Sequence, residues 1–84
     1  MKITLRQLLY FDALVREMHF GRAADRVAVT QPAMSAQIRE LEGLIGGSLI
    51  DRSSKRLALT PLGRVVSQRL RPILDGAAQI ESLG

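Results

Sequence analysis

Apolar residues return at three- and four-residue steps along most of the chain, which is the spacing of amphipathic helices. Residues 4–7 read Thr-Leu-Arg-Gln, the spacing of a capping box, so we expect a first helix that starts here and runs to about Glu17. A short second helix is expected over residues 21–27, where small alanines permit close packing. Residues 28–29 then form a brief connection.

The pattern predicts a third helix from Thr30, which can cap it, to about Ile45. Pro32 falls in its first turn, where a missing amide proton costs little. Gly46 follows and can supply the left-handed conformation that ends helices. The apolar positions of this helix form one narrow stripe for the core: Met34, Ile38, Leu41 and Ile45.

Two short extended pieces, residues 49–52 and 57–59, flank the polar residues 53–56 and predict a small β-hairpin. Thr60 and Pro61 then provide a cap and a first-turn proline for a fourth helix. We therefore expect a mainly α fold, a winged helix-turn-helix with a three-helix bundle and a small β-hairpin wing, followed by a long linker helix. The winged domain would occupy residues 1–60 and the linker helix residues 61–84.

Composition limits how this fold can be stabilised. A chain of 84 residues is near the size at which one core is only marginally stable, and it has no cysteine and one histidine. Pairing with a second copy is the remaining option, and neither a metal nor a cofactor is expected. We interpret His19 as a surface or loop residue, and Asp12 and Glu17 as ordinary helix-face acids. No catalytic set can be assembled, so we do not expect an enzyme.

No apolar run reaches the ~20 residues that span a membrane, and the start of the chain lacks the apolar core of a signal peptide. A cytoplasmic protein without membrane contact is therefore expected. The net charge is +4, and six basic residues but no acid lie between Arg52 and Leu74. Such a block favours an anionic partner, although a solvated helix face has the same composition.

The outer face of the third helix carries the candidate binding residues. At 100° per residue, Pro32, Ser35, Ala36 and Arg39 fall away from the apolar stripe, with Gln31 at the start of the helix. Small residues permit close approach to a duplex, and the longer side chains can bond to base edges or phosphates. Any amphipathic helix has a polar outer face, so the helix-turn-helix spacing and the basic hairpin carry the preference for DNA. The alternatives are a protein-interaction or dimerisation module with an acidic partner and, more distantly, an enzyme.

Two segments of the chain are specific at their separation, Gln-Pro-Ala-Met-Ser at residues 31–35 and Leu-Thr-Pro-Leu-Gly at residues 59–63. With these segments the sequence resembles the N-terminal DNA-binding domain of the LysR-type bacterial transcription regulators. Further matches are Leu-Arg-Gln-Leu at residues 5–8, Tyr10-Phe11, Phe20, Arg-Ala-Ala at residues 22–24, Val29-Thr30, Gln37-Ile38, Leu41-Glu42, Gly46, Leu49 and Arg52. Together they cover most of residues 3–63.

The resemblance implies that the helix over residues 30–45 enters the major groove and that the wing, residues 52–57, approaches the minor groove and the backbone. Matched by position, the recognition-helix contacts are Gln31, Pro32 and Ser35, and the wing cations are Arg52, Lys55 and Arg56. Ala36 stands where the family often has a longer polar residue such as arginine. Recognition of the DNA bases is therefore expected to shift to Arg39 or to a methyl contact with thymine.

Apolar residues of the last helix step by four, three, four and three, a heptad-like seam: Val66, Leu70, Ile73, Ala77 and Ile80. They can pack on the first helix of the same chain or on a second copy. The resemblance implies the second, an antiparallel linker-helix homodimer on an inverted-repeat operator in double-stranded DNA. Pro72 interrupts the seam and should bend or break the helix, and we expect a bend.

The resemblance also implies a longer protein whose C-terminal domain binds a small-molecule inducer and drives tetramer formation. This chain ends at Gly84, in or just after the linker helix, so we expect a fragment without an inducer site. A nucleoid-associated location follows from the expected DNA binding.

Overall fold

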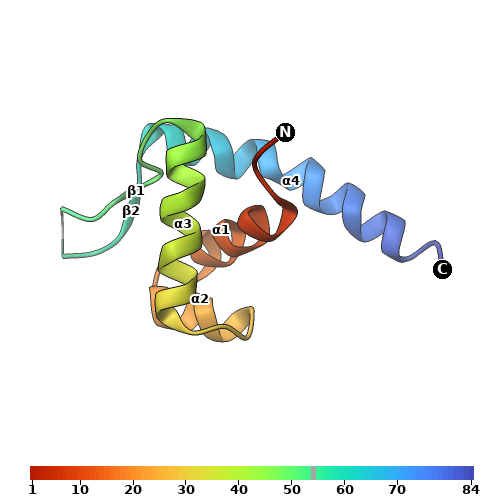
Figure 1. Cartoon of the computed structure of the whole chain (residues 1–84), viewed down its shortest axis with the longest axis horizontal. Helices are drawn as coiled ribbons and strands as arrows, with labels where there is room; N and C mark the ends of the chain where they lie inside the picture. Colours follow the sequence, from red (N-terminus) through yellow and green to blue (C-terminus); the bar gives the residue numbers. More distant parts are fainter. Residues whose placement is uncertain (54) are drawn as a thin grey trace.

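The structure, a computed structural model, describes residues 1–53 and 55–84. Its elements in chain order are α1 (Leu5–Glu17), α2 (Phe20–Arg26), α3 (Gln31–Ile45), β1 (Ile50–Asp51), β2 (Ala58–Leu59) and α4 (Pro61–Glu81). Figure 1 shows α1, α2 and α3 gathered in a bundle, the hairpin projecting at one end and α4 extending beyond the bundle at the other. The molecule measures 43 × 25 × 20 Å. The predicted winged helix-turn-helix with a long final helix is confirmed.

Helix boundaries follow the predicted caps. Thr4 Oγ1 accepts a hydrogen bond from the N–H of Gln7 at 3.1 Å, and Gln7 Oε1 accepts one from the N–H of Thr4 at 2.9 Å, so the capping box is confirmed. Thr30 caps α3, which ends at Gly46 with a φ of 95°. The bounds of α2 differ from the prediction by one residue at each end, because His19 acts as its cap.

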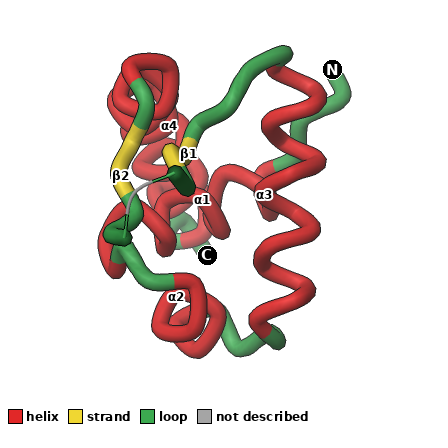
Figure 2. Tube along the Cα trace, turned by 90° about the vertical axis from the view of Figure 1, so that its left-hand side faces the viewer, coloured by secondary structure: helices red, strands yellow, loops and turns green. Residues whose placement is uncertain are grey.

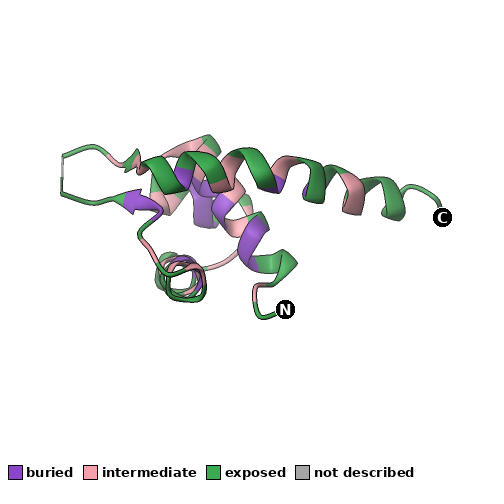
Figure 3. Cartoon of the chain, turned by 90° about the horizontal axis from the view of Figure 1, so that it is seen from above, coloured by how far each residue is buried: buried purple, intermediate pink, exposed green. Residues whose placement is uncertain are grey.

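The core is centred on α1, which packs against α2, α3 and α4. The predicted stripe of α3 is confirmed for Met34, Ile38 and Leu41, which are fully buried, whereas Ile45 is half-buried. The core side chains are Leu8, Phe11, Ala13, Leu14, Ala23, Ala24, Met34, Ile38, Leu41, Leu49, Ile50, Leu70 and Leu74. Figure 3 shows the buried segments on the inner side of the helices, while the last turns of α4 are exposed or half-buried. The first half of α4 thus belongs to the core of the winged domain.

The hairpin consists of two-residue strands, shorter than expected, in which Ile50 pairs with Leu59 and Asp51 with Ala58. Residue 54, part of the predicted polar tip, lies outside the described residues. The junction with α4 is tight: the Thr60 hydroxyl donates to Ser48 O at 2.6 Å and accepts from the N–H of Gly63 at 2.9 Å. A Cβ at Gly63 would collide with the backbone oxygen of Leu49. The Thr-Pro-x-Gly segment therefore combines a cap with a glycine that lets the start of α4 approach the backbone just before β1.

Helix α4 continues without a break through Pro72, whose side chain faces solvent. The structure thus rules out the break that the sequence left open. None of the described helices combines the length and the apolar character needed to cross a membrane.

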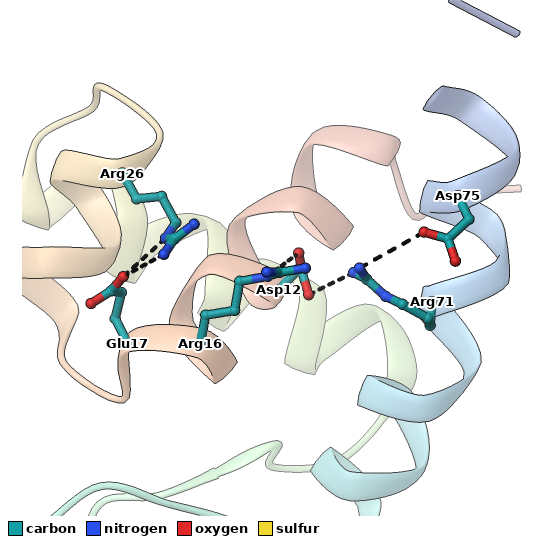
Figure 4. Close-up of polar contacts among 6 residues, drawn as sticks. All are labelled: Asp12, Arg16, Glu17, Arg26, Arg71 and Asp75. Atoms are coloured by element: carbon teal, nitrogen blue, oxygen red, sulfur yellow. Dashed lines mark hydrogen bonds and ion pairs between the residues drawn. The ribbon is translucent and has the colours of Figure 1, made fainter. Parts of the chain in front are cut away.

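Ion pairs join α4 to α1 at the level of Pro72. Figure 4 shows Asp12 between two arginines, with Arg16 at 3.1 Å on the same helix and Arg71 of α4 at 2.8 Å. Arg71 also lies 3.9 Å from Asp75, one turn further along α4. Asp12 is thus a helix-face acid whose carboxylate also links two helices that are far apart in the sequence.

The connection between α2 and α3 contains a left-handed residue that the pattern did not predict. Ala28 has a φ of 59° and is exposed, and the following N–H of Val29 donates to Ala24 O at 3.0 Å. For an L-residue this conformation costs roughly 1–2 kcal/mol relative to a right-handed one. Ala28 therefore holds a conformation that glycine would adopt without strain.

We expect Ala28→Gly to raise the free energy of unfolding by about 0.5–1 kcal/mol, because the relief of strain exceeds the added freedom of the unfolded chain. Urea unfolding followed by circular dichroism measures this change. Ala36→Gly is the matched control, since Ala36 is exposed within α3 and the same substitution there should destabilise by about 1 kcal/mol. Equal destabilisation by both substitutions would contradict the prediction.

Candidate nucleic-acid interface

The start of α3 presents an open surface to solvent. Gln31, Pro32, Ala36 and Arg39 are exposed and Ser35 is half-buried, as predicted for the outer face. Within the part of the chain that the structure describes, no hydrogen bond or ion pair holds the Arg39 guanidinium. A cation without a partner on a surface of small side chains is available to an external anion. Figure 2 shows α3 on one side of the view and the hairpin on the other, with α2 below, and Figure 1 shows α3 at the end of the molecule from which the hairpin projects.

Small buried residues let α2 pack closely against its neighbours. Ala23 and Ala24 of α2 are 0% and 2% exposed, and α2 contacts both α1 and α3. On the opposite side of α2, Glu17 at the end of α1 lies 2.9 Å from Arg26 and 3.7 Å from Arg22. Figure 4 shows the contact with Arg26. Glu17 is therefore a helix-face acid that ties α1 to α2, a contact that the sequence did not predict.

Glu42, near the end of α3, connects this helix to the hairpin. Its Oε2 accepts hydrogen bonds from the N–H groups of Leu49 at 2.8 Å and Ile50 at 3.3 Å. The Arg52 guanidinium adds two further contacts, Nη2 to Oε1 at 3.2 Å and Nη1 to Oε2 at 3.4 Å. This fork-to-fork geometry is the strongest form of an arginine–carboxylate pair. One carboxylate thus fixes the direction in which the hairpin leaves α3.

The same contacts determine the charge state of Glu42. Partial burial raises the pKa of its carboxyl, but the N–H donors of Leu49 and Ile50 and the Arg52 guanidinium outweigh that effect. The pKa of Glu42 is therefore held below its ordinary value of 4.5, and the side chain stays ionised at neutral pH.

Arg52 was predicted as a wing cation that contacts DNA, and the structure gives it a second role. Besides the pair with Glu42, its guanidinium lies 5.8 Å from the centre of the Phe20 ring, a cation–π contact. Its side chain is 32% exposed. Because the Arg52 guanidinium already contacts Glu42 and Phe20, the positive charge that the hairpin presents to solvent comes mainly from Lys55 and Arg56. Both of these residues are exposed.

The predicted seam of α4 divides between two faces. Leu70 is 2% exposed and packs in the core of its own chain, with Leu74 one turn later, so it cannot supply a surface for a partner. Val66 and Ala77 are half-buried. Ile73 and Ile80 are 48% and 69% exposed, and Val65, which the seam did not include, is 48% exposed. The exposed apolar face of α4 therefore contains fewer residues than the predicted seam, and one of them, Val65, was not predicted.

The sequence does not predict the structural roles of two residues in this region, His19 and Glu42. His19 caps α2 through its Nδ1, a use of imidazole that sequence patterns do not indicate. Glu42 gives a weak local signal, because its donors lie seven to ten residues away. Within the described ranges, no group of three or more His, Cys, Asp or Glu side chains could hold a metal ion.

Comparisons with known proteins agree with this geometry. Residues 5–64 match the family model described as bacterial regulatory helix-turn-helix protein, lysR family. The chain is 41% identical to the SDS degradation transcriptional activation protein of a Pseudomonas species, over 95% of this chain and 28% of that protein. It is 44% identical to the uncharacterized HTH-type transcriptional regulator YnfL of Escherichia coli, over 99% of this chain and 29% of that protein.

A solved structure is similar as well. The crystal structure of the BenM DBD–catB site 1 DNA complex matches with a TM-score of 0.91 and 37% identity, over 96% of this chain and 90% of that one. The chain therefore spans less than a third of the length of the two curated relatives and nearly all of this structure.

We expect Glu42→Gln to lower the free energy of unfolding by about 1–2 kcal/mol at pH 7, because the Arg52 guanidinium and two N–H groups lose a charged acceptor. Since the folded-state pKa is depressed, the charge contributes in full above about pH 4.5. That contribution is lost as the pH falls through the lower folded-state value. The difference between the variant and the original chain should therefore shrink towards pH 3, as measured by urea unfolding at several pH values.

Glu40→Gln is the matched control, because Glu40 lies two residues earlier on α3 and is exposed. It should change the stability by less than about 0.5 kcal/mol. A Glu42→Gln effect that is equally small, or one that stays constant down to pH 3, would show that the carboxylate does not anchor the hairpin.

Proposed function

Because the chain belongs to the LysR family of bacterial regulatory helix-turn-helix proteins, we propose that it binds duplex DNA sequence-specifically as a homodimer and so regulates transcription. The supporting observation is the exposed outer face of α3, with an Arg39 that the described fold leaves unpaired, together with a basic hairpin. The solved BenM DBD, similar over nearly its whole length, is in complex with DNA.

In this proposal α3 lies in the major groove and the hairpin tip approaches the minor groove and backbone. Gln31, Ser35 and Arg39 read base edges or position the helix on phosphates, while Pro32 and Ala36 provide close apolar contact, for example with a thymine methyl. Lys55 and Arg56 supply the charge of the wing, and Arg52 contributes mainly by holding the hairpin against Glu42. The chain would act in the cytoplasm, at the nucleoid.

A second copy would dock on the exposed apolar face of α4. Val65, Ile73 and Ile80 are each about half exposed or more, and grooves lined by apolar side chains run on both sides of this helix. One groove is formed with Ile3, Leu8 and Ile45, and the other with Leu5, Leu9 and Leu74. Burying this surface would add stability that an 84-residue core has in short supply.

A two-fold dimer presents two α3 helices and would therefore recognise two half-sites of an inverted repeat. In a longer protein, a C-terminal effector domain would bind the small-molecule inducer and promote tetramers. Selection of bound sites from random duplexes by the purified chain tests DNA binding, symmetry and half-site spacing together. Recovery of unrelated sequences without an inverted repeat would contradict the proposal.

We expect Arg39→Ala and Ser35→Ala each to weaken binding to a selected duplex by about 1–3 kcal/mol, because contacts to base edges discriminate between sequences on this scale. Binding to unrelated duplex should fall only slightly. Fluorescence anisotropy with both duplexes measures the two affinities. Lys2→Ala is the control for loss of one positive charge, because Lys2 precedes α1 and lies outside the proposed surface.

A salt series distinguishes DNA binding from the competing interaction module. Arg56→Ala should lower the affinity and reduce the salt slope by about one counterion. If duplex affinity barely responds to salt, or if the substitutions on α3 leave it unchanged, a protein-interaction module with an acidic partner is the better explanation.

We expect Ile73→Asp to convert the dimer into a folded monomer, because it places a charge in the centre of the proposed interface. Ile73 is 48% exposed in the single chain, so the variant should keep its helical circular dichroism. Sedimentation equilibrium measures the change in mass. Gln68→Asp, an exposed position of the same helix, should remain dimeric. A dimeric Ile73→Asp variant would refute this interface.

A further inference from the structure

A cleft of about 370 Å³ separates the start of α2 from the hairpin. Its lining residues are Met18, His19, Arg22, Lys55, Arg56 and Leu57. Three of them are cations, and no acid is among the described residues of the lining. Figure 2 shows the hairpin loop next to the start of α2, so two segments more than thirty residues apart in the sequence form this opening. Such a concentration of positive charge in a concave surface favours an anion.

The imidazole of His19 is fixed in one orientation and one tautomer. Its Nδ1 accepts the hydrogen bond from the N–H of Arg22 at 3.0 Å, which caps α2. A neutral imidazole whose Nδ1 accepts a hydrogen bond carries its proton on Nε2. The N–H at Nε2 is therefore the ring's donor to any ligand in the cleft. The sequence predicts no function for His19. In the structure its Nδ1 accepts the hydrogen bond that caps α2, and its Nε2–H is left as a donor.

The position of the ring links the cleft to the proposed recognition surface. A Cβ added at Gly21 would lie 3.0 Å from His19 Cε1 and 3.5 Å from Gln31 Oε1. The imidazole and the first side chain of α3 therefore converge on the same point of α2. A duplex that lies along the start of α3 would bring a sugar–phosphate strand to this point.

The guanidinium of Arg22 is also available to an external anion. Its side chain is 64% exposed, and its ion pair with Glu17 is long, at 3.7 Å. Glu17 has a closer partner in Arg26, at 2.9 Å. A phosphate in the cleft would therefore compete only with a loose pair on an exposed side chain.

We propose that this cleft binds one backbone phosphate of the duplex, with His19 Nε2–H as a hydrogen-bond donor and Arg22, Lys55 and Arg56 as the surrounding positive charge. This rests on the proposed DNA binding and adds a contact that fixes the register of the domain on the duplex. Phosphate contacts of this kind position a protein without reading sequence.

The first test separates the cap from the donor. Asparagine is among the best N-cap residues, so His19→Asn keeps an acceptor for the N–H of Arg22 but removes the ring N–H. The variant should unfold at nearly the same urea concentration, and its affinity for a selected duplex should fall about 3- to 10-fold, as for the loss of one ordinary hydrogen bond. Thr4→Asn is the matched control, an exchange of one good N-cap for another at α1, and should leave the affinity unchanged.

A second test locates the phosphate. Each phosphate of the selected duplex is replaced in turn by an uncharged methylphosphonate, and affinities are measured for the original chain and for His19→Asn. At one position per half-site the neutral group should abolish the effect of His19→Asn, because the two changes remove the same interaction. Equal effects of His19→Asn on every duplex would overturn the proposed contact while leaving DNA binding intact. Absence of duplex binding by the original chain would overturn both.

Nuclear magnetic resonance provides a direct readout, because His19 is the only histidine in the sequence. The ¹⁵N shifts of the free chain should report the Nε2–H tautomer, and addition of the selected duplex should move the imidazole signals. The opposite tautomer, or signals that do not respond to the duplex, would overturn the proposal. A response to millimolar inorganic phosphate but not to the duplex would identify a site for small anions and would likewise overturn the assignment to the DNA backbone.

Discussion

The Glu42 carboxylate is the contact on which the relative placement of α3 and the hairpin depends. It accepts hydrogen bonds from the N–H groups of Leu49 and Ile50 and forms an ion pair with Arg52. These contacts hold the first residues of the hairpin against the end of α3. Thr60 holds the same segment from the other side through Ser48 O. Since a two-residue strand pair has little stability of its own, these side-chain contacts, rather than the ladder, set the direction of the wing.

Features that are local in the sequence could be predicted from it, and contacts between distant residues could not. A cap or an apolar stripe is decided by residues three or four positions apart, which is why the capping box at Thr4, the start of α3 at Thr30 and its end at Gly46 agree with the structure. Asp12 and Arg71 are 59 positions apart, and nothing in either neighbourhood indicates that they meet. The outer face of α3 is such a local feature, whereas the contacts of Glu42 join residues that are distant in the sequence.

The linker helix shows a different limit of sequence patterns. A heptad-like spacing predicts that one side of a helix is apolar, but it does not say what covers that side. In α4 apolar residues occur on two sides, and the bundle takes Leu70 and Leu74, which leaves Val65, Ile73 and Ile80 exposed. The choice depends on the approach of α4 to β1 at Gly63 and on the Arg71–Asp12 pair, both of which are tertiary contacts.

The ion pairs determine where on the molecule the positive charge is left without a carboxylate partner. Asp12, Glu17 and Glu42 each neutralise arginines of the frame, on α1, α2, α4 and at the base of the hairpin. Among the described residues, the cations without a carboxylate partner are Lys2, Arg6, Arg39, Lys55, Arg64 and Arg69. Asp12, Glu17 and Glu42 are thus used where they join elements. Residues 51–56 of the hairpin contain three cations and one acid, whereas α3 contains one cation and two acids. Because the field of a protein follows this arrangement rather than the total of +4, an approaching duplex would be attracted mainly by the hairpin.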